Sequence, residues 1–248
     1  MDDPVARVLV LTEDGARDAH AVLRALVLKM LKQVDSKVRT QHVELHPADE
    51  PQVQLTMRAN RWRDHGVGGE AARRQLVGTI AETLLLGDHR FVAVHFDGDT
   101  AWSRRARSTT RADFEARVVG PVAGILSGRL DSQSAVTALA RLIVVQPFYS
   151  VEAWTFQHTK VGARECRSRG THGHHGRFDD WAADRGVLDE LRKPKEHVCF
   201  GSDLNLELAG SSFPAKAVLD AGKSWRATVE SLAASPDLVA ALRRTWQS

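Results

Sequence analysis

The stretch that most constrains the fold is RFVAVHF, residues 90–96, which is apolar at almost every position. A strand with one face in water alternates apolar and polar residues, whereas a strand covered on both faces does not. RLIVVQP at 141–147 has the same character. Because helices on both faces of a sheet cover such strands, the two stretches predict an α/β sandwich with a mostly parallel central sheet.

The remaining segments alternate between short β-rich runs and amphipathic stretches. ARVLVLT (6–12) and QHVELHP (41–47) are predicted strands, and apolar residues recur at helical spacing over 22–34 and 70–86. We expect a single domain with a core at about 5–160 and a C-terminal elaboration at about 161–248. Further helices are expected at 110–128, 148–158, 178–191, 213–222 and 236–247.

Two polar segments are expected to be loops. The first, 47–70, contains three arginines around Trp62, which could stack on a base. The second, 166–180, is low in apolar residues. Its His172, His174 and His175, together with Cys166, suggest a zinc site, but their spacing fits no standard finger. We therefore expect a polar loop there and leave zinc open.

Composition narrows the class of protein only slightly. Lys and Arg number 34 against 31 Asp and Glu, so the net charge of +3 leans only mildly toward polyanionic partners. The N-terminal MDDPVARV does not resemble a signal peptide, and no apolar run reaches the length of a membrane helix. Two cysteines favour a reducing compartment over a disulfide framework. The sequence therefore predicts a cytoplasmic protein with no membrane partner.

Acidic residues follow three of the predicted strands. Glu13 and Asp14 come after the first strand, with Asp18 one helical turn on, and Asp97 and Asp99 come after 90–96. Glu152 follows 141–147. Parallel strands present their carboxyl ends at one edge, where ligands bind. Carboxylates gathered there raise one another's pKa unless a cation joins them, and Mg²⁺ takes oxygen ligands. The pattern predicts a metal site for phosphate chemistry.

A purely structural interpretation competes with this one. Asp, Gly and Asp are ordinary turn residues, and the same tripeptide suits a loop that caps the next helix. One such motif alone favours that interpretation, and the acids after the first strand shift the balance toward a metal site. His95, inside the strand, is expected to be a hydrogen-bonded core histidine rather than a base.

Several motifs together resemble the Toprim domain, in particular small stand-alone Toprim-like proteins related to the overcoming-lysogenization-defect nucleases. The matching segments are LVLTEDGARD (9–18), VAVHFDGDT (92–100), QPFYSVEAWTFQ (146–157), KPKE (193–196) and FPAKAVLDAGKSWRATVESL (213–232). The resemblance covers nearly the whole chain through short motifs. It implies a Rossmann-like sandwich and a Mg²⁺- or Mn²⁺-dependent nuclease, or a related phosphodiester phosphoryl-transfer enzyme.

The resemblance also implies roles for individual residues. Glu13 would be a metal ligand or general acid/base, and Asp97 and Asp99 the metal-binding pair. Glu152 would lie close by, either as an additional ligand or as a residue that supports the ligands. Toprim strands end in Glu-Gly, whereas Asp14 intervenes here. Either Glu13 or Asp14 is therefore the ligand of the first strand, and both are kept as candidates.

Basic residues near these motifs are candidates for binding phosphates. They are Arg58, Arg61, Arg63, Arg104, Arg105, Lys193, Lys195, Lys216 and Lys223. The expected partner is nucleic acid, with DNA favoured over RNA. The resemblance adds an ATPase partner subunit and a role in bacterial antiphage defence or genome maintenance. The alternatives are a catalytically silent module that binds nucleic acid or a partner, and a DxD glycosyltransferase or a phosphatase.

Overall fold

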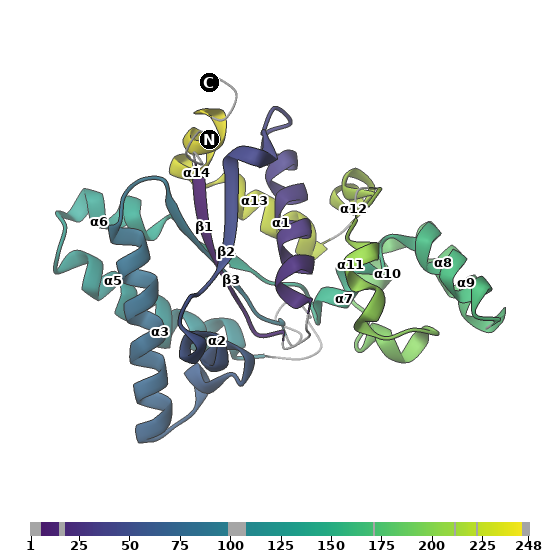
Figure 1. Cartoon of the computed structure of the whole chain (residues 1–248), viewed down its shortest axis with the longest axis horizontal. Helices are drawn as coiled ribbons and strands as arrows, with labels where there is room; N and C mark the ends of the chain where they lie inside the picture. The colour runs from purple at the N-terminus through teal and green to yellow at the C-terminus, as the bar shows by residue number, and fades with distance from the viewer. Residues whose placement is uncertain are drawn as a thin grey trace.

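Four parallel strands form one sheet in the order β2-β1-β3-β4 (Figure 1). The computed structural model describes residues 6–14, 18–98, 108–170, 172–210, 212–221 and 223–244. The strands are β1 (Ala6–Thr12), β2 (Val43–Pro47), β3 (Arg90–His95) and β4 (Leu142–Val145). The predicted α/β class with a parallel, Rossmann-like sheet is confirmed.

Helices connect the strands and cover both faces of the sheet (Figure 1). The α-helices are α1 (Ala19–Val34), α2 (Pro51–Arg58), α3 (Val67–Leu85), α4 (Thr110–Phe114), α5 (Gly120–Ser127), α6 (Ser132–Leu139), α7 (Val151–Thr155), α8 (Thr159–Ser168), α9 (His172–Ala183), α10 (Arg185–Asp189), α11 (Asn205–Leu208), α12 (Ala215–Ala221), α13 (Lys223–Ala233) and α14 (Pro236–Arg244). Shorter helical segments are η1 (Thr40–His42), η2 (Arg61–Arg63), η3 (Glu115–Val119), η4 (Pro194–His197) and η5 (Ser202–Leu204). None of the described helices combines the length and the apolar character that crossing a membrane requires.

The register of the sheet brings the carboxyl ends of the central strands together. β1 pairs with β2 on one side and with β3 on the other, and Thr12 lies opposite His95. His95 in turn lies opposite Val145 of β4. Because all these pairings are parallel, the residues that follow β1, β3 and β4 emerge at the same edge.

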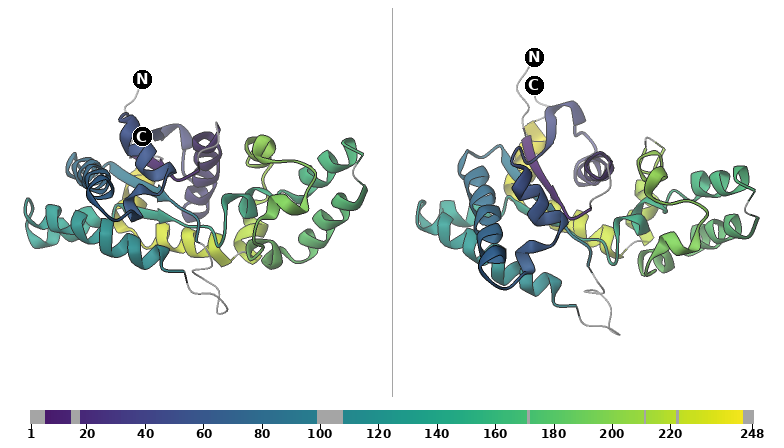
Figure 2. Two further views of the ribbon diagram at one scale, coloured as in Figure 1. Left: turned by 90° about the horizontal axis from the view of Figure 1, so that it is seen from below. Right: turned by 60° about the horizontal axis from the view of Figure 1, so that its bottom comes forward.

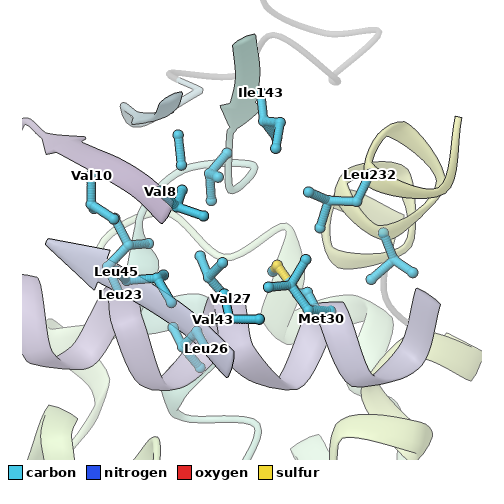
Figure 3. Close-up of a cluster of buried hydrophobic side chains, with 14 of the residues drawn as sticks. Val8, Val10, Leu23, Leu26, Val27, Met30, Val43, Leu45, Ile143 and Leu232 are labelled. Carbon is cyan, nitrogen blue, oxygen red and sulfur yellow. The ribbon is translucent and has the colours of Figure 1, made fainter. Parts of the chain in front are cut away.

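Alternate residues of the strands pack into two separate cores, as expected for a sheet buried on both faces. Val8 and Val10 point toward α1, where they meet Leu23, and toward the C-terminal helices (Figure 3). Leu9 and Leu11 point to the opposite face, toward α2, α3 and the helices from α4 to α6. The continuous apolar runs of the sequence arise because both sets of side chains are buried.

A third core lies in a C-terminal lobe formed by α8 to α11. Phe156, Phe178 and Phe200 pack edge to face or stacked within it. The lobe lies beside the sandwich, on the side away from α3 and α5 (Figure 1, Figure 2). α13 and α14 then return to the sheet and pack against the face that α1 covers. The segment after residue 160 thus contributes both a separate lobe and part of the central core.

The two cysteines form a disulfide inside this lobe. Cys166 of α8 is bonded to Cys199, and their Cα atoms are 5.8 Å apart. The two cysteines were interpreted as a sign of a reducing compartment rather than of disulfides, and the bond contradicts that interpretation. Two cysteines 33 residues apart, with no second cysteine pair in the chain, match no known disulfide pattern, so the sequence does not predict the bond.

Both segments expected to be loops are largely helical. Residues 47–70 contain α2, η2 and the first turn of α3, and Trp62 is fully buried against Phe96 and Phe114. Residues 166–180 contain the end of α8 and most of α9. These predictions failed because each helix buries few apolar residues, so the helical period is hard to see in a polar segment. Trp62 is also unable to stack on a nucleic-acid base.

Reduction of the Cys166–Cys199 disulfide is expected to destabilise the protein. Closing a loop of 33 residues contributes roughly 3–4 kcal/mol in the chain-entropy description. Thermal unfolding with and without a phosphine reductant measures the effect, and Tm should fall on reduction. A Cys166→Ser/Cys199→Ser variant is the control. Its Tm should match that of the reduced wild-type protein and should not change when the reductant is added. An unchanged Tm for the wild-type protein on full reduction would contradict the prediction.

Candidate functional site

Acidic residues from β1 and β3 meet at the carboxyl edge of the sheet. The backbone N–H of Asp97 donates to Oε1 of Glu13 at 2.6 Å, although the two residues are 84 apart in sequence. The N–H of Glu13 donates to the carbonyl of His95 at 3.1 Å, which continues the β1–β3 pairing past the last strand residue. The predicted convergence of these strand ends is therefore present in the fold.

A polar pocket of about 230 Å³, here called the acidic pocket, lies at this junction. Its walls come from the ends of β1 and β3, the turn between α2 and η2, the first turn of α7, and η4. The lining residues are Glu13, Asp14, Asn60, Asp97, Val151, Glu152 and Lys195. Four of the predicted acids thus share one pocket.

Glu152 is buried in the acidic pocket and paired with a lysine. Its Oε1 lies 2.6 Å from Nζ of Lys195 and accepts a hydrogen bond from Nδ2 of Asn205 at 3.2 Å. Burial alone would raise the pKa of Glu152, but the hydrogen bond and charge of Lys195 outweigh it and lower the pKa below its usual value. Glu152 is therefore ionised at neutral pH, and Lys195 supplies its counter-charge.

His95 is buried beneath the acidic pocket in a neutral state. Its Nδ1 is 2.9 Å from the hydroxyl of Thr12, which also accepts a hydrogen bond from the N–H of Asp14. Burial lowers the pKa of His95 to about 4, although the charge of Glu152 acts in the opposite direction. The Nε2 atom has no hydrogen-bond partner among the described residues and lies 3.9 Å from Oδ1 of Asp97. His95 is thus a hydrogen-bonded core residue, as predicted, and links the ends of β1 and β3.

Close packing around residue 98 explains why a glycine follows Asp97. Its N–H donates to the carbonyl of Pro147 at 3.1 Å. A Cβ atom at this position would lie 2.5 Å from the carbonyl oxygens of both Pro147 and Phe148. The chain after β3 can pack this closely on the chain after β4 only because residue 98 has no side chain.

The predicted phosphate-binding residues are found in different environments. Arg58 and Arg61 are exposed, two residues before and one residue after Asn60, which lines the acidic pocket. Arg63 is half-buried and lies 3.5 Å from Asp113. Asp99, Arg104 and Arg105 lie outside the described residues.

The four predicted lysines all form ion pairs. Lys195 pairs with Glu152 inside the acidic pocket. The other three pairs are on the surface: Lys193–Glu196 at 2.7 Å, Lys216–Asp220 at 3.4 Å, and Lys223–Glu190. Exposed pairs of this kind contribute only about 0–1 kcal/mol, so phosphate can displace their carboxylates at little cost.

The donor chemistry of the acidic pocket suits a hard divalent cation. Glu13, Asp14 and Asp97 offer carboxylate oxygens, and Oδ1 of Asn60 is buried without a hydrogen-bond partner among the described residues. Mg²⁺ and Mn²⁺ favour all-oxygen ligand sets of this kind. Within the described ranges, however, no three Asp, Glu, His or Cys side chains stand close enough together to form a metal site. The same finding covers His174 and His175 of α9, whereas the side chain of His172 lies outside the described residues, and Cys166 is occupied by its disulfide.

Sequence reasoning missed two residues of this site and one pairing. Asn60 enters the acidic pocket from a left-handed turn, with a φ of 53°. An asparagine before a helical segment is a weak signal for that conformation. Asn205 lies on a short helix of the C-terminal lobe. Neither its contact with Glu152 nor the pairing of Lys195 with Glu152 has a signature in the sequence.

Comparisons of the chain with protein-family models, curated proteins and solved structures gave no match. The resemblance to Toprim proteins therefore depends on the short sequence motifs alone. The strand-end geometry is compatible with it, because the Glu13 carboxylate of the first motif accepts a hydrogen bond from the backbone of Asp97 in the second.

The buried, neutral state of His95 predicts that stability falls as the pH drops from about 6.5 to 4. In this range the unfolded chain binds a proton at His95 and the folded protein does not, so acidification favours unfolding. The loss should reach roughly 2–3 kcal/mol at pH 4. Urea unfolding across this range in EDTA measures the slope for the wild-type protein and for His95→Gln. The slope should be smaller in the variant, and equal slopes would contradict the buried neutral histidine.

Replacing Lys195 by methionine is expected to destabilise the protein at neutral pH by about 1–3 kcal/mol, because Glu152 then stays buried without its counter-charge. The penalty should shrink as the pH falls toward 4, since protonation neutralises Glu152. Denaturant unfolding at several pH values measures both effects. Lys193→Met is the matched control, because it breaks an exposed pair two residues away and should change stability by less than about 0.5 kcal/mol. Equal effects of the two variants would contradict the role given to Lys195.

Proposed function

We propose that this chain is a Mg²⁺- or Mn²⁺-dependent nuclease, or a related phosphodiester phosphoryl-transfer enzyme, of the Toprim type. The observation that carries the proposal is the contact between Glu13 and the backbone of Asp97, at 2.6 Å. It joins the acids of two motifs that lie far apart in sequence, in a pocket that Asp14 and Glu152 also line. A site at the carboxyl edge of a parallel sheet is where this fold class binds its ligands.

The residues of the acidic pocket divide into two groups by chemistry. Glu13, Asp14 and Asp97 would hold the metal, with Oδ1 of Asn60 as a further oxygen donor, and their side chains would have to draw together as the ion binds, because they stand too far apart without it. When bound, a divalent ion polarises a phosphoryl oxygen and lowers the pKa of a coordinated water. Glu152 is held in place by its ion pair and hydrogen bond, so it orients Lys195 toward the pocket.

Arg58 and Arg61 complete the proposed substrate site. They flank Asn60 and are exposed to solvent, so their guanidinium groups can reach the phosphates of a strand whose scissile bond lies over the acidic pocket. Binding through such contacts should weaken as salt is raised, since phosphate neutralisation releases counterions. DNA is the proposed polymer. An ATPase partner, a cytoplasmic location, and a role in bacterial defence or genome maintenance extend the proposal by analogy with Toprim proteins.

A second candidate function is a catalytically silent module that binds nucleic acid or a partner protein. One observation favours it: the ammonium group of Lys195 already compensates the charge of Glu152 without a metal. In this alternative the acidic pocket is a structural feature, and the exposed arginines alone bind the ligand. The two candidates differ in turnover and agree on salt-dependent binding.

Cleavage of supercoiled plasmid and of single- and double-stranded oligonucleotides tests the proposal. Activity should require Mg²⁺ or Mn²⁺, stop in EDTA, and fall at least about 100-fold in Glu13→Gln and Asp97→Asn, because loss of a ligand exceeds the 10–100-fold cost of disturbing its surroundings. Glu82→Gln, on the exposed side of α3, is the matched control and should keep wild-type activity.

Two outcomes would contradict the nuclease proposal. Cleavage that survives Asp97→Asn would place the activity elsewhere. Metal-independent binding without any cleavage would favour the silent module, provided that binding falls in Arg58→Gln/Arg61→Gln and as salt is raised.

A further inference from the structure

A second, larger pocket lies at the outer edge of β4. It has a volume of about 520 Å³, within the range of roughly 300–1,000 Å³ that is typical of small-molecule sites. The residues just before and in α4, the end of β4 and one face of α13 line it. It shares no lining residue with the acidic pocket. We call it the edge pocket.

Gln146 gives the edge pocket a buried donor. The residue follows β4 directly and is only 3% exposed, and its Nε2 has no hydrogen-bond partner among the described residues. A buried donor without an acceptor costs about 1–3 kcal/mol, and most such groups in proteins find a partner. Because Gln146 lines the pocket, an acceptor on a bound ligand would satisfy this amide.

The other walls suit a flat ring that carries an anion. Val144 and Ala227 provide apolar contact, and Ser108 and Ser231 add hydroxyl groups. Arg111 is exposed and pairs with Glu115 at 2.6 Å one helical turn away. An exposed pair within a helix is weak, so a phosphate can replace Glu115 as the partner of the guanidinium group.

The edge pocket is next to the acidic pocket along the sheet edge. Gln146 precedes Pro147, whose carbonyl accepts the hydrogen bond from Gly98. Gly98 in turn follows Asp97, which lines the acidic pocket. A polymer bound over the acidic pocket therefore has a second site beside it, at the end of the neighbouring strand.

From these observations we infer that the edge pocket is a nucleotide subsite, in which Gln146 hydrogen-bonds the edge of a base and Arg111 binds a phosphate. The choice of ligand rests on the proposed action on nucleic acid. Glutamine amides pair with base edges in protein–nucleic acid complexes, and the apolar walls match the faces of a base. The edge pocket would hold one nucleotide of the substrate while the acidic pocket faces a nearby phosphodiester.

Isothermal titration with the four 2′-deoxynucleoside 5′-monophosphates, in EDTA, tests the subsite without any contribution from a metal. At least one monophosphate should bind at least tenfold more tightly than its nucleoside and than inorganic phosphate. Gln146→Leu and Arg111→Gln should each weaken that binding at least tenfold. The matched controls Gln133→Leu on α6 and Arg74→Gln on α3, both exposed, should leave the dissociation constant within twofold.

Folding of the key variant is checked separately. Gln146→Leu removes an unsatisfied donor, so its Tm should equal or exceed that of the wild-type protein. Arg111→Gln changes only an exposed side chain and tests the same pocket if Gln146→Leu does not fold.

The outcomes separate this inference from the proposed function. Absence of monophosphate binding, equal binding of inorganic phosphate, or binding that both edge-pocket variants leave unchanged would overturn the subsite. Monophosphate binding through Gln146 without metal-dependent cleavage would support the subsite and count against the nuclease. If cleavage depends on Asp97 but Gln146→Leu does not change monophosphate binding, the result would support the nuclease and count against the subsite.

Discussion

The parallel pairing of β1 with β3 is the constraint on which the candidate site depends. It places Thr12 opposite His95, so the residues that follow the two strands emerge together. Glu13 and Asp97 then contact each other through a backbone N–H, and His95 contacts Thr12 beneath them. A shift of one residue in this pairing would turn alternate side chains to the opposite face and separate these contacts. Packing on both faces of the sheet holds the register, so the two cores position the polar pocket.

Much of the central fold could be predicted from the sequence, because its signals are local. β3 and β4 are continuous apolar runs, and α1 and α3 keep the helical period. The convergence of Glu13 and Asp97 followed from a general rule about parallel sheets. The polar helix α2 and the first half of α9 could not be found in this way, since too few of their residues are buried to show a period. Trp62 was interpreted as a stacking residue because nothing local shows that it lies between two phenylalanines.

The features that escaped prediction connect distant parts of the chain. The disulfide joins two cysteines whose spacing has no recognisable meaning. Lys195 was a candidate for binding phosphate, and the structure pairs it with a buried carboxylate from another element. Such contacts depend on how the C-terminal lobe is placed against α7, and this placement is set by many small apolar contacts rather than by a motif. A sequence pattern can therefore predict the acidic residues of the acidic pocket but not the basic residue that pairs with one of them.

The close packing at Gly98 has a mechanical consequence. Its N–H is bonded to the carbonyl of Pro147, and no space remains between residue 98 and the chain at 147–148. Tightly packed groups transmit displacements instead of absorbing them. Asp97 and Gln146 lie on either side of this contact, so we expect a displacement of one of them to press on the other. On this expectation, a ligand in one pocket would alter the shape of the other through a single peptide unit.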